Sequence, residues 1–564
     1  MTGRGLSKYI KNGAMRTIHY IVILSALSAA LFLPGLGKLA LTDPDETFYA
    51  QTAREMLEEG DWVTPRIFGE PQYEKPPLYY WLVMLSYKVF GVSEFSARFP
   101  SIIFAFLGIL GVFLTGRLFY SRLTGFLSSV ILATGIEYFV VGRACVTDTV
   151  LTVFIIYTIF FFMSAWSSGR RSLYLASSAA AALAVLTKGP IGLFIPGAVI
   201  LIYLIWIKEV KDLFRKVPVL ASLCVFFTVA LPWYAAVYFS NGSAFVDEFF
   251  GVHNVIRFLH PEHRIGDTPF FFVPVVIAGI FPWTVFFLFA VWDMYKRRAK
   301  TLCENARKGS APRSPHVFLA VWFLLVFLFF SVSRTKLVTY ILPLFPAVAI
   351  ITGRFWERMM TGGMERFSSR MVKWMSGLYV LSCFMVAGGV IGFVWYRFPA
   401  SDMFYGSLIG SALVILCAFL AASLLLRGKI LLSFSAITLS FVLAIIPVVI
   451  YVFPTIEEYE SRKALSLAIK DLAGPDDSVG AECDHRRGVA FYSGRTDVED
   501  IHHYADRRRF FRQEKSLWGI MKDRHYDIVK NDPRAKNVAK ILRSGNHVLV
   551  TNVPIENIGE KKGE

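Results

Sequence analysis

The stretch FYGSLIGSALVILCAFLAASLLL at residues 404–426 contains no charged side chain, and Arg427 and Lys429 follow it directly. In a helix that rises about 1.5 Å per residue, these 23 residues would extend roughly 35 Å. The hydrocarbon core of a bilayer is about 30 Å thick. The stretch therefore predicts a transmembrane helix, and a second apolar run at 430–453 predicts another immediately after the basic turn.

Similar apolar runs recur from the N-terminus to Phe453 and then stop. Of the 564 residues, 55% are apolar and only 18% are charged, which is too little charge to cover soluble domains of this size. The sequence predicts an α-helical polytopic membrane protein. Its predicted spans, about 13 in all, lie at residues 17–37, 98–118, 124–141, 149–166, 172–187, 190–207, 217–239, 270–292, 316–332, 336–353, 372–396, 404–426 and 430–453.

Basic residues alternate between the predicted loops in the way that the positive-inside rule requires. If the N-terminus is cytoplasmic, every inside loop is basic, and an odd number of crossings places residues 454–564 outside with the loops at 38–97 and 240–269. We therefore expect two domains, a transmembrane body at 1–453 and a small outer α/β domain at 454–564. Within the second, Ala464 to Leu472 is helical in pattern, while GVAFY (488–492) and HVLVT (547–551) resemble strands.

Several classes of protein are excluded by composition. The net charge of +17 comes from short Lys and Arg clusters between apolar runs, not from one basic face, so no nucleic-acid partner is expected. The six cysteines show no CxxC or paired spacing, which argues against a zinc finger or a disulfide framework. No Gly-rich phosphate loop is present, so no nucleotide cofactor is expected. The N-terminal run is long and lacks a small-residue cleavage site, which indicates a retained first span.

The first outer loop predicts two short helices. Asp43-Pro44-Asp45 precedes an amphipathic run, which is the pattern of a helix start. The segment from Pro76 to Phe90 is aromatic and apolar but too short to cross a bilayer, and it predicts a helix lying in the interface.

Charged residues and histidines from loops far apart in sequence share the outer face of this topology. Ionisable groups at membrane depth are costly, and they usually line a cavity in which they have partners. The set comprises Asp45, Glu46, Glu74, Lys75, Asp148, Lys188, His253, Asn254, Arg257, His260, His263, Arg264, Arg334 and Lys336.

Each of these features also has a purely structural explanation. Asp45, Glu46 and Asp148 stand at helix starts, where a carboxylate caps the helix or complements its dipole. Glu74-Lys75-Pro76-Pro77 reads equally as a surface ion pair before a proline turn. Lys188 in a tight outer turn is most simply a snorkelling lysine. The histidines of residues 253–263 follow no strict zinc spacing, although a mixed site with Glu74 and open positions is an alternative.

Several motifs in one order resemble a known family. DPDETFYAQTAREML, YEKPPLYYW, the turn at Asp148, LTKGPIGL, the HN…RF…HR loop with the later Pro282-Trp283, and SRTKLVTYILPLFPAVA are similar to the polyprenyl-phosphate-sugar-dependent membrane glycosyltransferases. Within them the similarity points to the bacterial lipid A aminoarabinose transferases, which are related to the protein O-mannosyltransferases. The resemblance covers about residues 17–453 and extends to the outer domain. It implies a GT-C fold with an active site at the periplasmic face of the bacterial inner membrane.

The resemblance also implies roles for individual residues. The catalytic carboxylates would be Asp45 and Asp148, with Glu46 beside them. A divalent metal, Zn or Mg/Mn, would be held by Glu74 with a histidine of the 253–263 loop, either His253 or His263, although His260 also aligns. The residues contacting the lipid phosphate would be Lys75, Arg257, Arg264, Lys336, Tyr340 and Lys188.

The expected reaction transfers a sugar from a polyprenyl phosphate to lipid A, with inversion at the anomeric carbon. The base for a hydroxyl acceptor would be Asp45 first and Asp148 second. Three alternatives stay open from sequence: transfer to protein or another glycan, a transporter, and a non-catalytic lipid-binding scaffold. A transporter would place its charges near the bilayer midplane and often show an internal repeat, whereas here the charges lie at one end.

Overall fold

The structure is a computed structural model that describes residues 16–256, 268–306, 314–362, 367–399, 401–460, 462–482, 485–535 and 538–554, without the side chains of 253–255, 297–306 and 458–460. The chain forms two compact units. Unit 1 comprises the described residues within 1–34, 74–78 and 101–450, and unit 2 those within 35–73, 79–100 and 451–564. Each unit is described by itself, and the predicted domain boundary after residue 453 stays a prediction.

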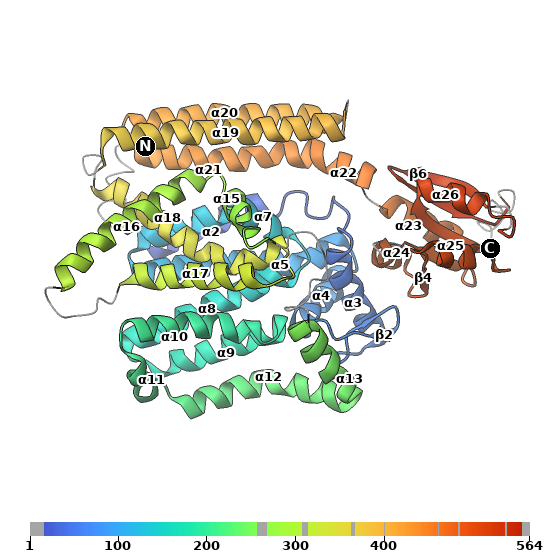
Figure 1. Cartoon of the computed structure of the whole chain (residues 1–564), viewed down its shortest axis with the longest axis horizontal. Coiled ribbons are helices and arrows are strands. Elements are labelled where there is room, and N and C mark those ends of the chain that lie inside the picture. Colours follow the sequence, from blue (N-terminus) through green and yellow to red (C-terminus); the bar gives the residue numbers. More distant parts are fainter. Residues whose placement is uncertain are drawn as a thin grey trace. The chain divides into compact units, whose positions relative to one another are not determined.

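Unit 1 is helical throughout its described residues (Figure 1). Helix α5 (Glu94–Phe119) belongs to it from Ser101 onward, and η4 (Val448–Val452) up to Ile450. The other elements are α2 (Thr17–Phe32), α6 (Arg122–Ala133), α7 (Ile136–Arg143), α8 (Thr147–Ser168), α9 (Arg171–Lys188), α10 (Ile191–Trp206), α11 (Val210–Lys216), α12 (Val219–Asn241), α13 (Ser243–Val246), η1 (Asp247–Ile256), α15 (Phe272–Gly279), α16 (Thr284–Ala306), α17 (Pro315–Val332), η2 (Val338–Leu344), α18 (Phe345–Gly362), α19 (Ser369–Arg397), α20 (Asp402–Leu426) and α21 (Ile430–Pro447).

The chain is a multi-span membrane protein. Within the described residues, eight helices are long and apolar enough to cross a membrane, and the number rises to eleven if each of three bent helix pairs is one span. Helix α2 is apolar but shorter. Helix α9 fills the predicted span at 172–187, yet its Ala- and Ser-rich sequence makes it less apolar than the others. The predicted total of 13 is therefore not confirmed, although a helix occupies each predicted range.

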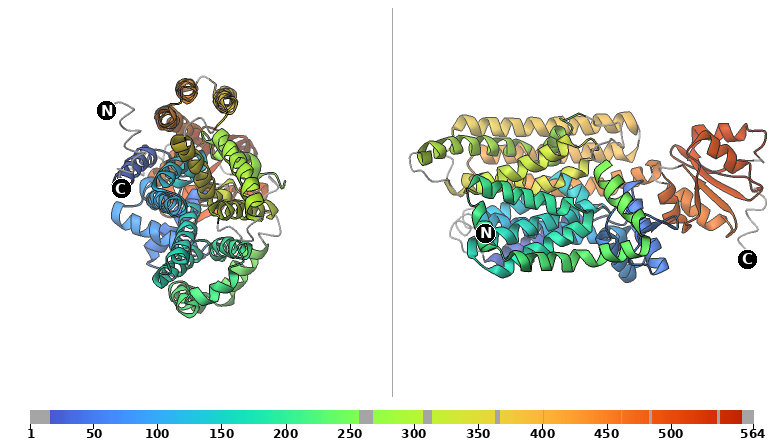
Figure 2. Two further views of the ribbon diagram at one scale, coloured as in Figure 1. Left: turned by 90° about the vertical axis from the view of Figure 1, so that its left-hand side faces the viewer. Right: turned by 60° about the horizontal axis from the view of Figure 1, so that its bottom comes forward.

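Small residues allow the helices of unit 1 to approach closely. Gly192 of α10 lies against the backbone of Ala184 and Val185 in α9, and Gly353 of α18 lies against the backbone of Ser128 in α6. Such contacts are typical of membrane helices, whose association depends on close packing more than on the hydrophobic effect. Figures 1 and 2 show α19, α20 and α21 side by side in the same unit.

Unit 2 combines the first long loop with the C-terminal segment. The loop contributes the predicted amphipathic helix α3 (Asp45–Glu59) and the predicted interfacial helix α4 (Leu78–Phe90), whose residues from Tyr79 onward belong to this unit. The other elements are β1 (Arg66–Ile67), β2 (Glu70–Pro71), α22 (Phe453–Glu460), α23 (Lys463–Leu472), β3 (Ser478–Ala481), α24 (Arg486–Ser493), β4 (Val498–Asp500), α25 (Tyr504–Phe511), β5 (Leu517–Lys522), α26 (Asp523–Lys530), β6 (Ala539–Ser544) and β7 (His547–Thr551).

The C-terminal strands form a sheet with the order β4-β3-β5-β7-β6 (red in Figure 2). Strand β3 is parallel to β4 and β5, whereas β7 is antiparallel to both β5 and β6. Side chains of β3, β5 and β7 pack with those of α23 and α24 in one buried cluster that includes Val479, Trp518 and Leu549. The sheet and its helices thus have a hydrophobic core of their own.

Two of the three sequence expectations for this segment are confirmed. Residues 464–472 form helix α23, and HVLVT forms strand β7. The strand predicted at GVAFY is wrong, because these residues lie in helix α24. Gly494, with φ of +79°, ends that helix in the left-handed conformation that glycine adopts most easily. The apolar run reads as a strand by composition, but Val489 and Ala490 are buried on one face of a helix.

Candidate functional site

Unit 1 contains a pocket of about 360 Å³. Its lining comes from four separate stretches of the chain, and it combines charged side chains with a wall of apolar ones. Ligand sites in proteins are commonly concave, largely apolar and supplied with a few polar groups that fix orientation. The lining residues are Glu74, Lys75, Asp148, Leu151, Lys188, Pro190, Ile191, Phe194, Phe329, Phe330, Ser333, Thr335 and Tyr340.

An ion pair between Asp148 and Lys188 forms part of the polar wall. Nζ of Lys188 lies 2.7 Å from Oδ1 of Asp148, and both side chains are largely buried. The same ammonium lies 4.5 Å from the ring centroid of Tyr340, which is within cation–π range. Lys188 is therefore held in place by two partners and is not a snorkelling side chain.

The backbone explains why these two charges meet. Asp148 stands in the first turn of α8, and Lys188 is the last residue of α9. Consecutive antiparallel helices bring the start of the first and the end of the second to the same end of the pair. Gly189 then reverses the chain with φ of +81° and ψ of −155°, a conformation that is essentially restricted to glycine.

Glu74 and Lys75 supply the second charged pair of the pocket. Nζ of Lys75 lies 3.2 Å from Oε1 of Glu74, and 3.2 Å from the carbonyl oxygen of the same residue. Pro76 and Pro77 follow and separate the pair from helix α4. The side chain of Lys75 is 11% exposed, which is low for a lysine in a surface ion pair. The surrounding fold therefore holds this side chain in place.

The apolar wall and two hydroxyl residues were not singled out from sequence. Phe194 comes from α10, and Phe329 and Phe330 come from the end of α17. Ser333 and Thr335 follow α17 and are buried, with the Ser333 hydroxyl donating to the carbonyl of Thr335 at 3.0 Å. Ser333 and Thr335 lie in the SRTKLVTY part of a motif that the sequence analysis quoted, so that motif could have identified them. Nothing in the sequence distinguished the three phenylalanines from the many others.

The pocket brings together five of the predicted residues, namely Glu74, Lys75, Asp148, Lys188 and Tyr340. Lys336 is buried and close to Tyr340 in sequence, but it does not line the pocket. Arg257, Arg264, His260 and His263 lie outside the described residues, and His253 is described only in its backbone within η1. Their predicted roles stay predictions.

The predicted metal site rests on one described side chain. Glu74 is present, but its two predicted histidine partners, His253 and His263, have no described side chains. Among the side chains that the structure describes, no group of three or more His, Cys, Asp or Glu is placed to hold a metal ion. Of the predicted metal ligands, Glu74 is thus the one whose side chain the structure describes, and Lys75 contacts it.

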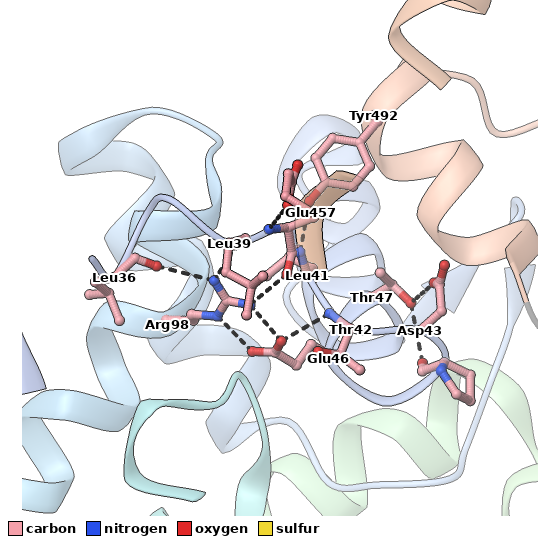
Figure 3. Close-up of polar contacts among 12 residues, drawn as sticks. Leu36, Leu39, Leu41, Thr42, Asp43, Glu46, Thr47, Arg98, Glu457 and Tyr492 are labelled. Atoms are coloured by element: carbon pink, nitrogen blue, oxygen red, sulfur yellow. Dashed lines mark hydrogen bonds and ion pairs between the residues drawn. The ribbon is translucent and has the colours of Figure 1, made fainter. Parts of the chain in front are cut away.

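Asp45 and Glu46 belong to unit 2 and form the first turn of α3. Asp45 is exposed, whereas Glu46 is buried and bound by Arg98 (Figure 3). Nε and Nη2 of Arg98 donate to the two oxygens of Glu46 at 2.8 Å and 2.6 Å, and the amide of Thr42 donates to Oε2 at 2.9 Å. These two neighbouring carboxylates thus have different surroundings.

Comparisons with known proteins agree with this fold. The family described as dolichyl-phosphate-mannose-protein mannosyltransferase matches residues 74–235, which include both charged pairs of the pocket. An uncharacterized protein of Aquifex aeolicus (strain VF5) is 33% identical over 335 residues, 59% of this chain and 72% of that protein. The undecaprenyl phosphate-alpha-4-amino-4-deoxy-L-arabinose arabinosyl transferase of Enterobacter sp. (strain 638) is 30% identical over 347 residues, 60% of each chain.

A solved structure extends the likeness to nearly the whole chain. The crystal structure of ArnT from Cupriavidus metallidurans bound to undecaprenyl phosphate superposes with a TM-score of 0.76, covering 95% of this chain and 98% of that one at 22% identity. The chain therefore has the fold of that protein and belongs to one family with the uncharacterized Aquifex aeolicus protein. In sequence it is similar to the undecaprenyl phosphate-alpha-4-amino-4-deoxy-L-arabinose arabinosyl transferases, of which it spans about three fifths.

Proposed function

We propose that this protein transfers a sugar from a polyprenyl phosphate to an acceptor at the outer face of the bacterial inner membrane, and that the acceptor is lipid A. The observation that carries the proposal is the pocket of unit 1, in which two lysines and two carboxylates meet an aromatic wall. The sequence similarity to an undecaprenyl phosphate-aminoarabinose transferase supports an aminoarabinose-type donor.

The pocket suits a donor that is charged at one end and apolar at the other. In the proposed complex the ammonium groups of Lys75 and Lys188 face the lipid phosphate, because cations stabilise the charge that develops on a departing phosphate. Phe194, Phe329 and Phe330 contact the start of the isoprenoid chain. Asp148 holds Lys188 at the pocket wall through the 2.7 Å ion pair.

The proposed reaction is a direct displacement. An acceptor oxygen attacks the anomeric carbon, a new C–O bond forms on one face, and the bond to the phosphate oxygen breaks on the other. The polyprenyl phosphate leaves with the electron pair, and the anomeric configuration inverts. A hydroxyl acceptor gives its proton to Asp45. A phosphate group of lipid A is already ionised and needs no base, and with this acceptor Asp45 holds the positively charged amino group of the sugar in place.

Glu74 with a histidine of the 253–263 loop would supply oxygen and nitrogen ligands to a divalent ion, which would add positive charge beside the phosphate. No step of the proposed reaction depends on that ion. The N-terminus is proposed to be cytoplasmic, and the residues after 453 periplasmic, in agreement with the basic inside loops.

The test is a transfer assay with the full-length protein in nanodiscs. Undecaprenyl phosphate carrying radiolabelled aminoarabinose is mixed with lipid A, and the label is followed by thin-layer chromatography. We expect transfer by the unchanged protein and a loss of at least about a hundredfold in Asp45→Asn and Lys75→Met, which remove the carboxylate that holds the sugar and a phosphate contact. Asp402→Asn and Lys373→Met, two exposed changes elsewhere in unit 1, are the matched controls.

The alternatives give different results in the same system. If the label moves only to a protein or to another glycan, that molecule and not lipid A is the acceptor. Label that crosses into sealed vesicles with its sugar-phosphate bond intact would indicate a transporter. Donor binding without transfer or transport, equally strong in Asp45→Asn, would indicate a non-catalytic lipid-binding protein and would overturn the proposal.

A further inference from the structure

The segment that leads into Asp45 is fixed by side chains from distant parts of unit 2. Residues 36–42 have no regular secondary structure beyond a turn, in which the amide of Lys38 donates to the carbonyl oxygen of Gly35. Besides Glu46 of α3, which accepts from the amide of Thr42, three side chains from distant parts of the sequence contact this backbone: Arg98 from α5, Glu457 from α22 and Tyr492 from α24 (Figure 3). We call residues 36–42 the leader segment.

Arg98 binds one side of the leader segment. Its Nη1 donates to the carbonyl oxygens of Leu36 and Leu39 at 3.1 Å and 2.6 Å, and its Nη2 donates to that of Ala40 at 2.8 Å. The same guanidinium binds both oxygens of Glu46. Arg98 therefore ties the leader segment to the first turn of α3, the turn that contains Asp45.

The C-terminal segment binds the other side. Oε2 of Glu457 accepts a hydrogen bond from the amide of Ala40 at 2.7 Å, and the hydroxyl of Tyr492 accepts one from the amide of Leu41 at 2.8 Å. Burial raises the pKa of Tyr492 above its ordinary value, so the phenol stays neutral. Two consecutive amides of the leader segment are thus satisfied by residues more than 400 positions away in sequence.

Neighbouring contacts restrict Asp43, which lies between the leader segment and Asp45. Its Oδ1 accepts from the Thr47 hydroxyl at 2.6 Å, and its Oδ2 lies 3.6 Å from Nδ1 of His485. Helix α24 approaches so closely that a Cβ at Gly488 would come within 2.6 Å of Oδ2. The chain before α3 is therefore held by the C-terminal segment at Ala40, Leu41 and Asp43.

We propose that Glu457 and Tyr492 are positioning residues for Asp45. They contact no reacting atom. They fix the backbone that enters α3, and a carboxylate that acts on the substrate must be held within a fraction of an ångström of its productive position. This inference rests on the proposed function, because it assigns the C-terminal segment a part in the reaction that Asp45 performs.

A purely structural role would be a simpler explanation for these hydrogen bonds. The fold of the C-terminal sheet, however, depends on a core of apolar side chains to which neither Glu457 nor Tyr492 belongs. Removing one hydroxyl at the edge of that core should leave the sheet intact. Positioning and stability can thus be separated by experiment.

The experiment compares Tyr492→Phe with Tyr504→Phe in the full-length protein. Both changes delete one hydroxyl from the C-terminal segment, but the Tyr504 hydroxyl accepts from Arg508 on the same helix and belongs to an exposed side chain. Glu457→Gln, which keeps an acceptor oxygen, is compared with Glu457→Ala, which does not. The readouts are kcat, KM for the lipid-linked donor, Tm, and amide hydrogen exchange in peptides covering residues 38–46.

We expect Tyr492→Phe and Glu457→Ala to lower kcat roughly tenfold, with KM and Tm nearly unchanged, because each loses one hydrogen bond that orients Asp45. Amide exchange in residues 38–46 should rise in both. Glu457→Gln should recover most of the activity, and Tyr504→Phe should change nothing. In an Asp45→Asn background, Tyr492→Phe should cause little further loss, since it acts through Asp45.

An unchanged kcat in Tyr492→Phe, or an unchanged amide exchange in residues 38–46, would overturn the positioning role. A fall in kcat that follows a fall in Tm, or that adds fully to the loss in Asp45→Asn, would assign these residues to stability alone and would also overturn it. Absence of transfer by the unchanged protein is a different result, because it rejects the proposed function itself.

Discussion

The ammonium of Lys188 lies 2.7 Å from a carboxylate oxygen of Asp148, although 40 residues separate them. Each charge also complements the dipole of its own helix, since Asp148 lies in the first turn of α8 and Lys188 in the last turn of α9. Both side chains are mostly removed from solvent. Burying such a pair removes both ions from water, which costs free energy. The pair therefore fixes the positions of the two side chains more than it stabilises the fold.

Breaking this pair should destabilise unit 1. Lys188→Met leaves the buried carboxylate of Asp148 without its ammonium partner, and Asp148→Asn leaves the buried ammonium of Lys188 without its carboxylate. Each change is therefore expected to lower the free energy of unfolding by about 3 kcal/mol. The double variant Asp148→Asn with Lys188→Met removes both charges and should recover at least half of the single losses. Thermal unfolding of the purified protein in detergent measures all three.

A transfer assay on the same three variants distinguishes a loss of stability from a loss of function. The double variant should be folded but inactive, because it lacks the lysine that faces the phosphate in the proposed complex. A double variant with wild-type transfer would exclude Lys188 from phosphate binding. Full additivity of the two single losses would show that the charges do not interact.

The close contact between α9 and α10 gives a second prediction. A Cβ at Gly192 would lie 2.5 Å from the carbonyl oxygen of Ala184 and 2.7 Å from the amide nitrogen of Val185, and neither backbone atom can move independently of its helix. Gly192→Ala is therefore expected to cost about 2 kcal/mol or more. It should also disturb Lys188 and Ile191, which line the pocket on either side of the turn.

Gly197→Ala is the matched control, since it lies on the same helix with no atom within 4 Å of the added Cβ. Tm and the fraction of monodisperse protein after extraction are the measurements. Equal values for Gly192→Ala and Gly197→Ala would mean that the two helices can separate without consequence, contrary to the close packing in the structure.

The helical body was predictable because apolar runs such as 404–426 are long enough to be unambiguous. Short or mixed segments were harder to assign. Helix α9 is rich in Ala and Ser, so its apolar character is low, although it occupies the predicted range 172–187. GVAFY contains a β-branched residue and two aromatics, as strands often do, but tertiary packing made it helical.

The candidate site was predictable where charge is rare. An Asp, a Glu or a Lys in an apolar environment stands out, and Asp148, Lys188, Glu74 and Lys75 were found for that reason. Phe329 and Phe330 were not, because aromatic residues serve equally well as core. Nor could sequence show that Glu46 is bound by Arg98, since the two residues are 52 positions apart in different helices, α3 and α5.

Arg98 gives a third prediction, because lysine cannot replace it. The guanidinium makes two hydrogen bonds to Glu46 and three to carbonyl oxygens of the leader segment, and an ammonium lacks the planar fork that allows this. Arg98→Lys keeps the charge but should still cost about 2 kcal/mol in stability and raise amide exchange in residues 36–42.

The control for this change is Arg370→Lys, which alters an exposed arginine at the start of α19. If charge alone mattered, Arg98→Lys would behave like that control. Protection of the leader segment in Arg98→Lys equal to that of the unchanged protein would contradict the importance of the five hydrogen bonds.

His547 provides a prediction about pH. Burial lowers the pKa of His547 to about 3, and the nearby positive charge of Arg462 acts in the same direction, as do His485, Lys522 and His525. The unfolded chain takes up this proton near pH 6.5, whereas the folded chain does so only near pH 3. The stabilisation from a neutral His547 is therefore complete above about pH 7 and is lost progressively as the pH falls toward 3.

Replacing His547 by Gln removes this dependence and keeps a polar group beside Arg462, whose Nη2 lies 3.3 Å from Nε2 of the histidine. The measurement is Tm at intervals from pH 8 to pH 5, with His502→Gln, an exposed change in the same unit, as control. Carboxylates titrate equally in all three proteins, so the difference between the unchanged protein and each variant isolates the histidine. His547→Gln should lose less Tm on acidification than the other two. Parallel curves for all three would show that His547 is protonated in the folded protein at an ordinary pH.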